Sequence, residues 1–275
     1  MIGNTDIDVA LECGLLAQRY GIDIVSSMVI VAWLMDLYRK GLITAKDTDG
    51  IPMEWGSPQA ILGMLKKTAH REGFGDVLAD GMLPAAERIG RGAEDYAYHM
   101  KGLPLYAEGN TPDDLIPLKG TALCMVMSSR GDIMRARMGT LVEELDLMRL
   151  LADEKTAAED KAAKLQKVNE LTGTEKAALP EQYEGKPELT IYSEDVITIG
   201  DCLSACKFMG SFLNFPFNEK YQAALFSAGT GVETSVDTLF KFARRVKNLE
   251  RSYCVREGMT RQTDSLPKHS MDKPV

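Results

Sequence analysis

The segment DCLSACKF, residues 201–208, places an aspartate and a cysteine five positions apart in an otherwise apolar part of the chain. A carboxylate accepts hydrogen bonds, and a thiolate binds zinc or iron. On one continuous helix, at about 100° per residue, Asp201 and Cys206 would point about 140° apart. They therefore converge on one small site only if the helix breaks between them. Otherwise they face two neighbouring groups, or one of them has no functional role.

Cys202 and Cys206 share a helix face at a spacing of four residues, which a two-cysteine metal site can use. Two thiolates do not complete a zinc or iron–sulfur site, and no CxxC or HxxxH pattern lies nearby. The residues alone leave two interpretations of Cys206 open, a cofactor ligand and a buried structural thiol.

Two further polar positions have a structural and a functional interpretation. Asp23 follows Arg-Tyr-Gly at a junction between two predicted helices, where aspartate is a preferred N-cap. Arg130 and Asp132 flank a glycine after the apolar run ALCMVM. They form either a solvated turn or a polar cluster at the mouth of a cavity. The three histidines are isolated and are not candidate catalytic residues.

The elements that must position these residues are mostly helical. Val9, Cys13, Leu16 and Tyr20 lie on one stripe of a helix that Thr5 caps and Gly21 ends. Residues 25–40 are apolar nearly all round and predict a central buried helix, and the Ser-Pro pair at 57–58 begins another.

The second half of the chain repeats this pattern. Ser193 begins the helix of the opening motif, with Val196, Ile199, Leu203 and Cys206 on one stripe. Thr234 caps a last long helix. Residues 96–100 predict a short strand, and residues 102–120 a long loop. Residues 154–171 are charged and alanine-rich and predict a solvent-facing helix, within an excursion that spans 152–176. The fold class is mainly α.

Composition excludes several classes of function. The chain of 275 residues has a formal net charge of -8, which is unfavourable for binding nucleic acid. Its longest apolar run, residues 28–35, falls well below the roughly 20 residues of a membrane-spanning helix. We expect no membrane association. The absence of a secretory leader and an odd count of five cysteines favour a reducing, cytoplasmic location.

Several stretches, taken in order, resemble the C-terminal helical part of the tungsten-dependent aldehyde ferredoxin oxidoreductase family. LAQRYGIDIVSS is similar to the family motif D-x-x-G-L-D-T-I-S, and REGFGDVLADG and SSRGDIMRAR follow in the family's order. YEGKPELTIYSEDVITIGDCLSACKF is similar to a YEGK segment leading to D-S-L-x-x-C-K-F. NLERSYCVREGMTRQTDSLP matches near the end. Only the charged helix at 154–171 lies outside the resemblance. The resemblance implies two helical domains, residues 1–118 and 119–275.

The resemblance implies roles for the candidate residues. Asp201, with Ala205, would contact a pterin, and Cys206 would be the fourth ligand of a four-iron four-sulfur cluster. Asp23 would make a second pterin contact beside Ile22, with Gly21 allowing close approach of the backbone. The implied cofactors are a tungsten or molybdenum bis-pterin and this cluster. Arg130 and Asp132 would border the substrate cavity.

The departures from the family pattern are equally informative. Gln18 replaces the first motif's leading aspartate, and SSRGDIMRAR lacks the histidine of aldehyde-oxidising members. The second departure argues against simple aldehyde oxidation and favours relatives that act on aromatic acyl-CoA thioesters, or a substrate not yet assigned. The family's N-terminal domain and its C-x-x-C-x-x-x-C ligands are not in this sequence. We therefore expect a fragment or split subunit that is inactive alone and that oligomerises or pairs with a companion chain and ferredoxin. The alternative is a cofactor-free helical scaffold.

Overall fold

The computed structural model describes residues 2–105, 118–129, 139–205 and 218–266. The chain divides into two compact units, the first formed by residues 1–112 with 266–274 and the second mainly by residues 113–265. Helices dominate both units, and the only pairing of strands within the described residues is one short antiparallel pair. The predicted mainly α fold class is confirmed. The predicted domain boundary at residue 118 stays a prediction.

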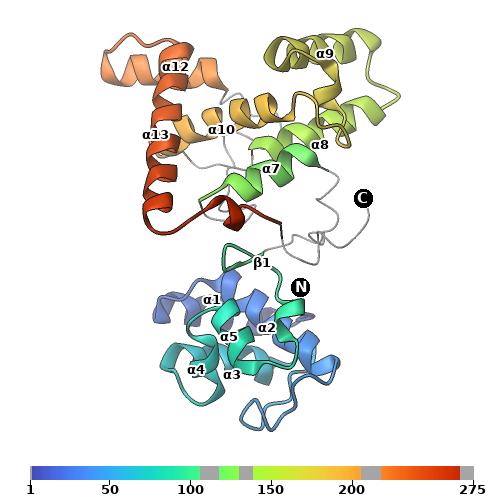
Figure 1. Cartoon of the computed structure of the whole chain (residues 1–275), viewed down its shortest axis with the longest axis vertical. Coiled ribbons are helices and arrows are strands. Elements are labelled where there is room, and N and C mark those ends of the chain that lie inside the picture. Colours follow the sequence, from blue (N-terminus) through green and yellow to red (C-terminus); the bar gives the residue numbers. More distant parts are fainter. Residues whose placement is uncertain (1, 106–117, 130–138, 206–217, 267–275) are drawn as a thin grey trace. The chain divides into compact units, whose positions relative to one another are not determined.

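The first unit is a cluster of helices with a small hairpin (Figure 1). Its elements are α1 (Ile7–Tyr20), α2 (Ile24–Arg39), α3 (Pro58–His70), α4 (Phe74–Leu78), α5 (Met82–Ile89), η1 (Ala93–Tyr96), β1 (His99–Met100) and β2 (Leu103–Pro104). Strand β1 is shorter than the strand predicted over residues 96–100, because Tyr96 belongs to η1.

Helix α2 is the buried centre of the first unit, as its apolar sequence predicts. Leu34, Met35 and Leu37 are fully buried, and they pack in one core with residues of α1, α3, α4 and α5. The indole Nε1 of Trp33 donates a hydrogen bond to the carbonyl of Ala93 at 3.3 Å. The polar atom of this buried aromatic side chain therefore has a hydrogen-bond partner.

Helix α1 begins one residue later than predicted. Its N-cap is Asp6, whose carboxylate accepts the N–H of Asp8 at 2.9 Å, and not Thr5. Aspartate is the stronger cap of the two. Gly21 ends the helix in the left-handed region, at φ 66°, as predicted. Tyr20 is partly exposed and does not complete the predicted core stripe.

The second unit is organised around one long helix, α10 (Lys186–Cys202). Its other elements are α7 (Lys119–Met127), α8 (Gly139–Ala152), α9 (Ala158–Thr172), η2 (Glu175–Ala178), α12 (Glu219–Thr230), α13 (Val236–Arg256) and η3 (Arg261–Thr263). Helix α10 packs against α7, α8, α9, α12 and α13 (Figure 1). Most residues along α10 are therefore buried, polar ones included.

A buried ion pair holds the N-terminal end of α10. The Lys186 ammonium lies 2.6 Å from the Glu144 carboxylate, and the side chains are 2% and 1% exposed. Glu144 also accepts the backbone N–H groups of Gly120 and Thr121 at 2.9 and 2.8 Å, and the Thr121 hydroxyl at 2.7 Å. A carboxylate from α8 thus caps the N-terminus of α7 and neutralises the first residue of α10.

Gly185 makes this close packing feasible. It lies just before α10 at φ 76°, and a Cβ built there would come within 2.8 Å of the Ala177 Cβ and 2.9 Å of the Thr174 Cγ2. Only glycine fits both the backbone conformation and the space. The Tyr-Glu-Gly-Lys segment, residues 183–186, therefore has a structural role, because its glycine allows α10 to begin in close contact with η2.

Both ends of α10 differ from the prediction. The helix begins at Lys186, seven residues before the predicted start at Ser193, and it ends at Cys202, so the stripe predicted to run on to Cys206 is wrong. Ser204 takes the left-handed conformation at φ 58°, and the Ala205 N–H donates to the Gly200 carbonyl at 2.9 Å. With the Ser204 N–H bonded to the Asp201 carbonyl at 3.1 Å, this is the Schellman arrangement that stops a helix.

The remaining helices largely follow the prediction. Helix α9 covers the predicted charged segment, and among its described residues only Val168 is buried. Helix α13 is capped by Ser235, whose hydroxyl accepts the Thr238 N–H at 3.2 Å, and not by Thr234. Thr234 instead uses its N–H to bond the Ser227 hydroxyl at 3.0 Å.

No single helix among the described residues is long and apolar enough to cross a bilayer. Helices α1 and α2 reach that length and apolar content only as a pair, and a bend of 120° separates them.

Replacing Lys186 by methionine tests the buried pair. Lys186→Met leaves the Glu144 charge buried without its cation, so we expect the free energy of unfolding of the second unit to fall by about 3–5 kcal/mol. Chemical denaturation followed by circular dichroism measures this. The control is Lys176→Met, which breaks the exposed Lys176–Glu184 pair and should change nothing measurable. Equal effects of both variants would contradict this account.

Replacing Ser204 by glycine tests the helix stop. A left-handed residue with a Cβ costs about 1–2 kcal/mol, and the extra chain entropy of glycine offsets part of the gain. We expect Ser204→Gly to stabilise the second unit by about 0.5–1 kcal/mol. Ser252→Gly, at an exposed position inside α13, should instead destabilise it by about 0.5 kcal/mol. A loss of stability in Ser204→Gly would refute the left-handed assignment.

Candidate functional site

Asp201 lies where α10 leaves the core. The residues before it, from Asp195 to Gly200, are all buried, whereas Asp201 and Cys202 are exposed. The burial of the helix therefore fixes the backbone that carries Asp201, whereas the residue itself is exposed. An exposed carboxylate on a fixed backbone is suited to accept hydrogen bonds from a group outside this unit.

The break after Cys202 changes the geometry of the opening motif. Because the chain turns at Ser204, the angle of about 140° for a continuous helix no longer separates Asp201 from the residues that follow. This is the helix break that a shared site requires. Ala205, half-buried, ends the turn. Cys206 lies outside the described residues, as do Arg130 and Asp132, so their roles stay predictions.

Asp23 is the N-cap of α2, as its sequence context predicts. Its Oδ1 accepts the Ser26 N–H at 2.7 Å, and the side chain is exposed. Gly21 and Ile22 form the turn before it, in which the Ile22 N–H donates to the Ala17 carbonyl at 2.9 Å. A Cβ added at Gly21 would meet nothing within 4 Å, so the backbone there is open to close approach. Capping α2 is the role of Asp23 that these contacts show, and its pterin contact stays a prediction.

The two aspartates belong to different units. Asp23 lies in the first and Asp201 in the second, and each unit is described by itself. A joint contact of both carboxylates with one pterin therefore stays a prediction. Gln18 is exposed at the end of α1, in the same turn region as Gly21.

Metal ligands are sparse in the described part of the chain. No group of three or more histidine, cysteine or acidic side chains there could hold a metal ion. Cys13 and Cys124 are buried, and burial raises the pKa of the Cys13 thiol. Cys13 is therefore a structural thiol, since a thiolate is the metal-binding form. Cys202 is exposed beside the motif, and no described residue completes a site around it.

Sequence patterns missed the polar groups that hold α10 to α13. Asp195 is fully buried, and its Oδ2 accepts the Nε of Arg244 at 2.9 Å. Lys247 lies 3.4 Å from Asp195 and 2.7 Å from Glu194. The sequence offers one signal for these contacts, the adjacent Glu194 and Asp195 in an otherwise apolar helix. Acidic side chains in such a helix are rarely buried without partners.

A second ion pair ties together the last motif. Arg251 donates to both carboxylate oxygens of Asp264, at 3.0 and 2.6 Å. This hydrogen bonding raises the pKa of the Arg251 guanidinium. The pair fixes the chain that follows α13 back onto the helix, which explains why arginine and aspartate are found at these positions.

Comparison with known proteins agrees with the resemblance read from the sequence. The family model described as aldehyde ferredoxin oxidoreductase, domains 2 and 3, matches residues 1–275. A tungsten-containing aldehyde ferredoxin oxidoreductase of Pyrococcus horikoshii is 24% identical over 280 residues, covering 100% of this chain and 40% of that protein. The aliphatic sulfonate oxidoreductase WOR-like subunit of Pyrococcus furiosus is 32% identical over 98 residues, covering 34% of this chain and 16% of that protein.

A solved structure shows the same fold. The active-site complex BamBC of benzoyl coenzyme A reductase, bound to 1,5-dienoyl-CoA, matches with a TM-score of 0.71 and 23% identity, covering 98% of this chain and 41% of that one. The chain thus spans about 40% of the length of the curated relatives that it matches end to end. Since the family model covers the whole sequence, the chain belongs to the aldehyde ferredoxin oxidoreductase family, of which it carries domains 2 and 3.

Proposed function

We propose that this chain is the C-terminal helical portion, or a separate subunit, of a tungstopterin and iron–sulfur oxidoreductase. The complete enzyme would oxidise aldehydes, or reduce the corresponding acid or thioester, with ferredoxin as electron partner in the cytoplasm. The observation that carries the proposal is the turn at Ser204, which breaks α10 directly between the aspartate and the cysteine of the family motif. An uninterrupted helix would have pointed them apart.

The described residues fit a pterin. Its ring edge presents N–H donors, and Asp201 and Asp23 are exposed carboxylates at the ends of well-packed helices. In the proposed role both residues accept these donors and orient the ring, and the open backbone at Gly21 allows close approach. The metal and pterin supply the redox chemistry when bound. The chain contributes binding and orientation.

The iron–sulfur cluster needs ligands from beyond this sequence. Cys206 would supply one thiolate, and a four-iron cluster takes four. Cys13 and Cys124 are buried, and Cys13 lies in the first unit's core. The family resemblance assigns the other three ligands to a C-x-x-C-x-x-x-C segment outside this sequence, and the chain covers only 40% of the length of a curated relative.

An uncovered apolar stripe on α1 supports such a partner portion. Ile7, Leu11 and Leu15 are 68%, 65% and 50% exposed. They lie on the helix face opposite Val9 and Leu16, which are buried. A helix that is apolar on two faces is typical of one packed between two layers. The names of two relatives, a subunit and a complex, are consistent with a companion chain.

The substrate has a second candidate. The segment SSRGDIMRAR lacks the histidine of aldehyde-oxidising members. The match to a complex bound to 1,5-dienoyl-CoA supports, as a relative only, an aromatic acyl-CoA reductase-type subunit. A cofactor-free helical scaffold is the alternative from another class, and Gln18 in place of a motif aspartate favours it.

Elemental analysis of the protein from its native source separates an enzyme subunit from a scaffold. Anaerobic purification should yield about four irons per chain for one cluster, together with tungsten or molybdenum, and a co-purifying polypeptide that carries C-x-x-C-x-x-x-C. The metals would be measured by mass spectrometry and the partner by peptide sequencing. A metal-free chain without such a partner would establish the scaffold and refute the proposal.

Two serine substitutions in the assembled enzyme test the cluster ligand. Cys206→Ser should lower the iron content and the visible absorbance of the cluster, because the cluster would lose one of its four thiolate ligands. Cys202 is exposed and directly follows Asp201 as the last residue of α10, and Cys202→Ser should leave both unchanged. Unchanged iron in Cys206→Ser would remove Cys206 from the ligand set.

A further inference from the structure

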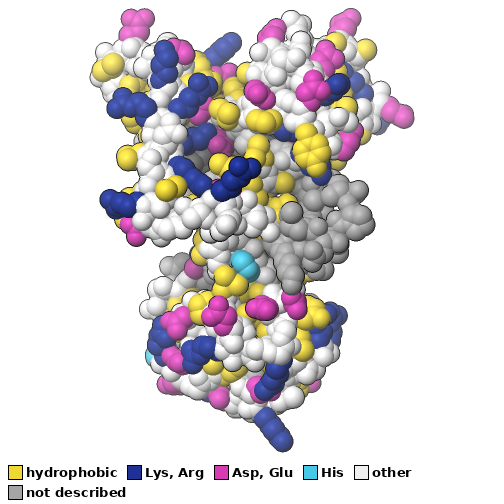
Figure 2. Space-filling view, in the orientation of Figure 1, with side chains coloured by type: hydrophobic (Ala, Val, Ile, Leu, Met, Phe, Trp, Pro, Cys, Tyr) yellow, Lys and Arg dark blue, Asp and Glu magenta, His cyan; other side chains and the backbone are white. Residues whose placement is uncertain are grey.

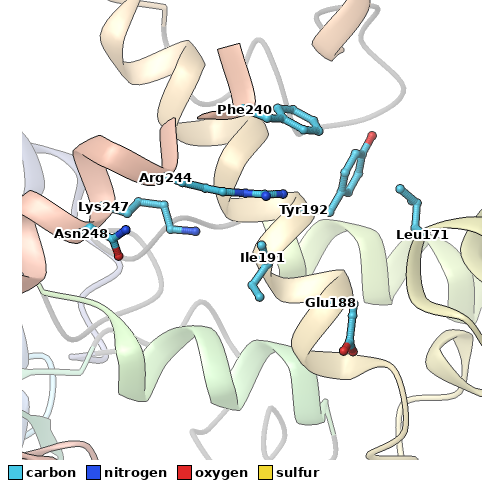
Figure 3. Close-up of a pocket in the computed structure, with 8 residues that line it drawn as sticks. All are labelled: Leu171, Glu188, Ile191, Tyr192, Phe240, Arg244, Lys247 and Asn248. Carbon is cyan, nitrogen blue, oxygen red and sulfur yellow. The ribbon is translucent and has the colours of Figure 1, made fainter. Parts of the chain in front are cut away.

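The second unit contains an open groove of about 510 Å³ between α9, α10 and α13. Figure 2 shows apolar side chains exposed in the hollow between the α9 and α12 ends of this unit. Figure 3 shows the groove from close by, with the Phe240 and Tyr192 rings near each other and with Ile191 and Glu188 on the same helix as Tyr192, α10. None of the residues that the family resemblance assigns to pterin or cluster lines it. Its volume is that of a small-molecule site.

Arg244 is fixed at the centre of the groove. Its Nε donates to the fully buried Asp195 at 2.9 Å, yet the Arg244 side chain is 57% exposed. In Figure 3 the guanidinium reaches across the groove toward Tyr192. Its two Nη groups have no partner within the described residues. A buried acid thus holds the near edge of the guanidinium and leaves the far edge available to a carboxylate.

The other charges of the groove are nearly balanced. Lys247 is mostly buried and already paired with Glu194 and Asp195. Lys167, on α9, lies 5.8 Å from the centre of the Tyr192 ring, and Glu188 is the exposed acid at the opposite end. The guanidinium of Arg244 is accessible, and the exposed carboxylate of Glu188 lies nearby. The groove therefore suits a ligand with a single negative charge and disfavours a multiply charged anion.

The walls select for a flat apolar body. Tyr192 and Phe240 meet edge to face at 5.9 Å, and the Tyr192 hydroxyl is bonded to Glu219 at 3.0 Å. The Tyr192 ring is thereby held in place, with its polar atom already occupied. Ile191 is 45% exposed on the floor. Aromatic walls beside an arginine are a composition typical of binding hot spots.

We infer that this groove binds a small monocarboxylate carried on an aromatic body, with the carboxylate on the Arg244 Nη groups and the ring against Ile191 and Tyr192. Leu171 of α9 forms one wall of the groove, and none of the groove's lining residues is one that the family resemblance assigns to the pterin or cluster. The inference does not depend on the proposed redox function.

Calorimetric titration with three probes tests the ligand class. The protein is used in the assembly in which it is isolated. Phenylacetate should bind saturably with one site per chain, whereas phenethylamine, with the same ring and the opposite charge, and acetate, with no ring, should not. Absence of phenylacetate binding, or equal binding of phenethylamine, would overturn the inference.

Variants then locate the binding. Arg244→Lys keeps a cation beside Asp195 but removes the fork, and should weaken phenylacetate binding about tenfold or more. Because this variant disturbs a buried pair, Ile191→Glu serves as a second test. It changes an exposed side chain, adds a negative charge to the floor, and should abolish binding.

Leu249→Ser is the matched control, since Leu249 is 73% exposed on α13 and does not line the groove. It should bind phenylacetate like the unmodified protein. Circular dichroism melting establishes that each variant is folded. Undiminished binding by folded Ile191→Glu would place the probe elsewhere and refute the groove.

Discussion

The second unit depends on one buried carboxylate, that of Glu144. Removing this charge from water is costly, and the cost is offset only because every acceptor position is used: two backbone N–H groups and a hydroxyl of α7, and the Lys186 ammonium of α10. The carboxylate therefore fixes three helices at one point. Hydrophobic packing alone would allow these helices to slide past one another. The hydrogen bonds and the ion pair of Glu144 form in only one relative position of the three helices, which we call their register.

Helix α10 carries that register through the second unit. It has 17 residues and is thus about 25 Å long. Asp195 binds it to α13 near the middle, and Ile199 packs with Ala223 and Leu239 near its far end. Contacts at three positions along the helix, Lys186, Asp195 and Ile199, consequently hold the last turn of α10, which carries Asp201. The cofactor contact proposed for Asp201 would require such a rigid backbone.

Local signals in the sequence predicted much of this architecture. The buried α2, the Asp23 cap, the left-handed Gly21 and the charged α9 all follow from periodicity or cap chemistry, which involve neighbours along the chain. The start of α10 was predicted wrongly, at Ser193, because Lys186 is stabilised by Glu144, 42 positions earlier. Asp195 and Arg244 are 49 positions apart and were likewise invisible to periodicity.

The candidate site was predictable in a different way. Asp23, Asp201 and Cys206 came from motif order, because single residues at the ends of helices have no local signature beyond capping. The chemistry of Asp201 became interpretable only with the turn at Ser204, and a serine in the left-handed region is not expected from sequence preference. The hydrogen bonds from the Ser204 and Ala205 N–H groups to α10 hold this conformation against the local preference.

Helix α9 is attached to the rest of the second unit in an unusual way. Among its described residues only Val168 is buried, so the helix adds little to the core while forming one wall of the groove. Changes on its exposed face would therefore leave the helix arrangement set by Glu144 undisturbed. One wall of the groove could thus be altered through a single helix without moving the backbone that carries Asp201.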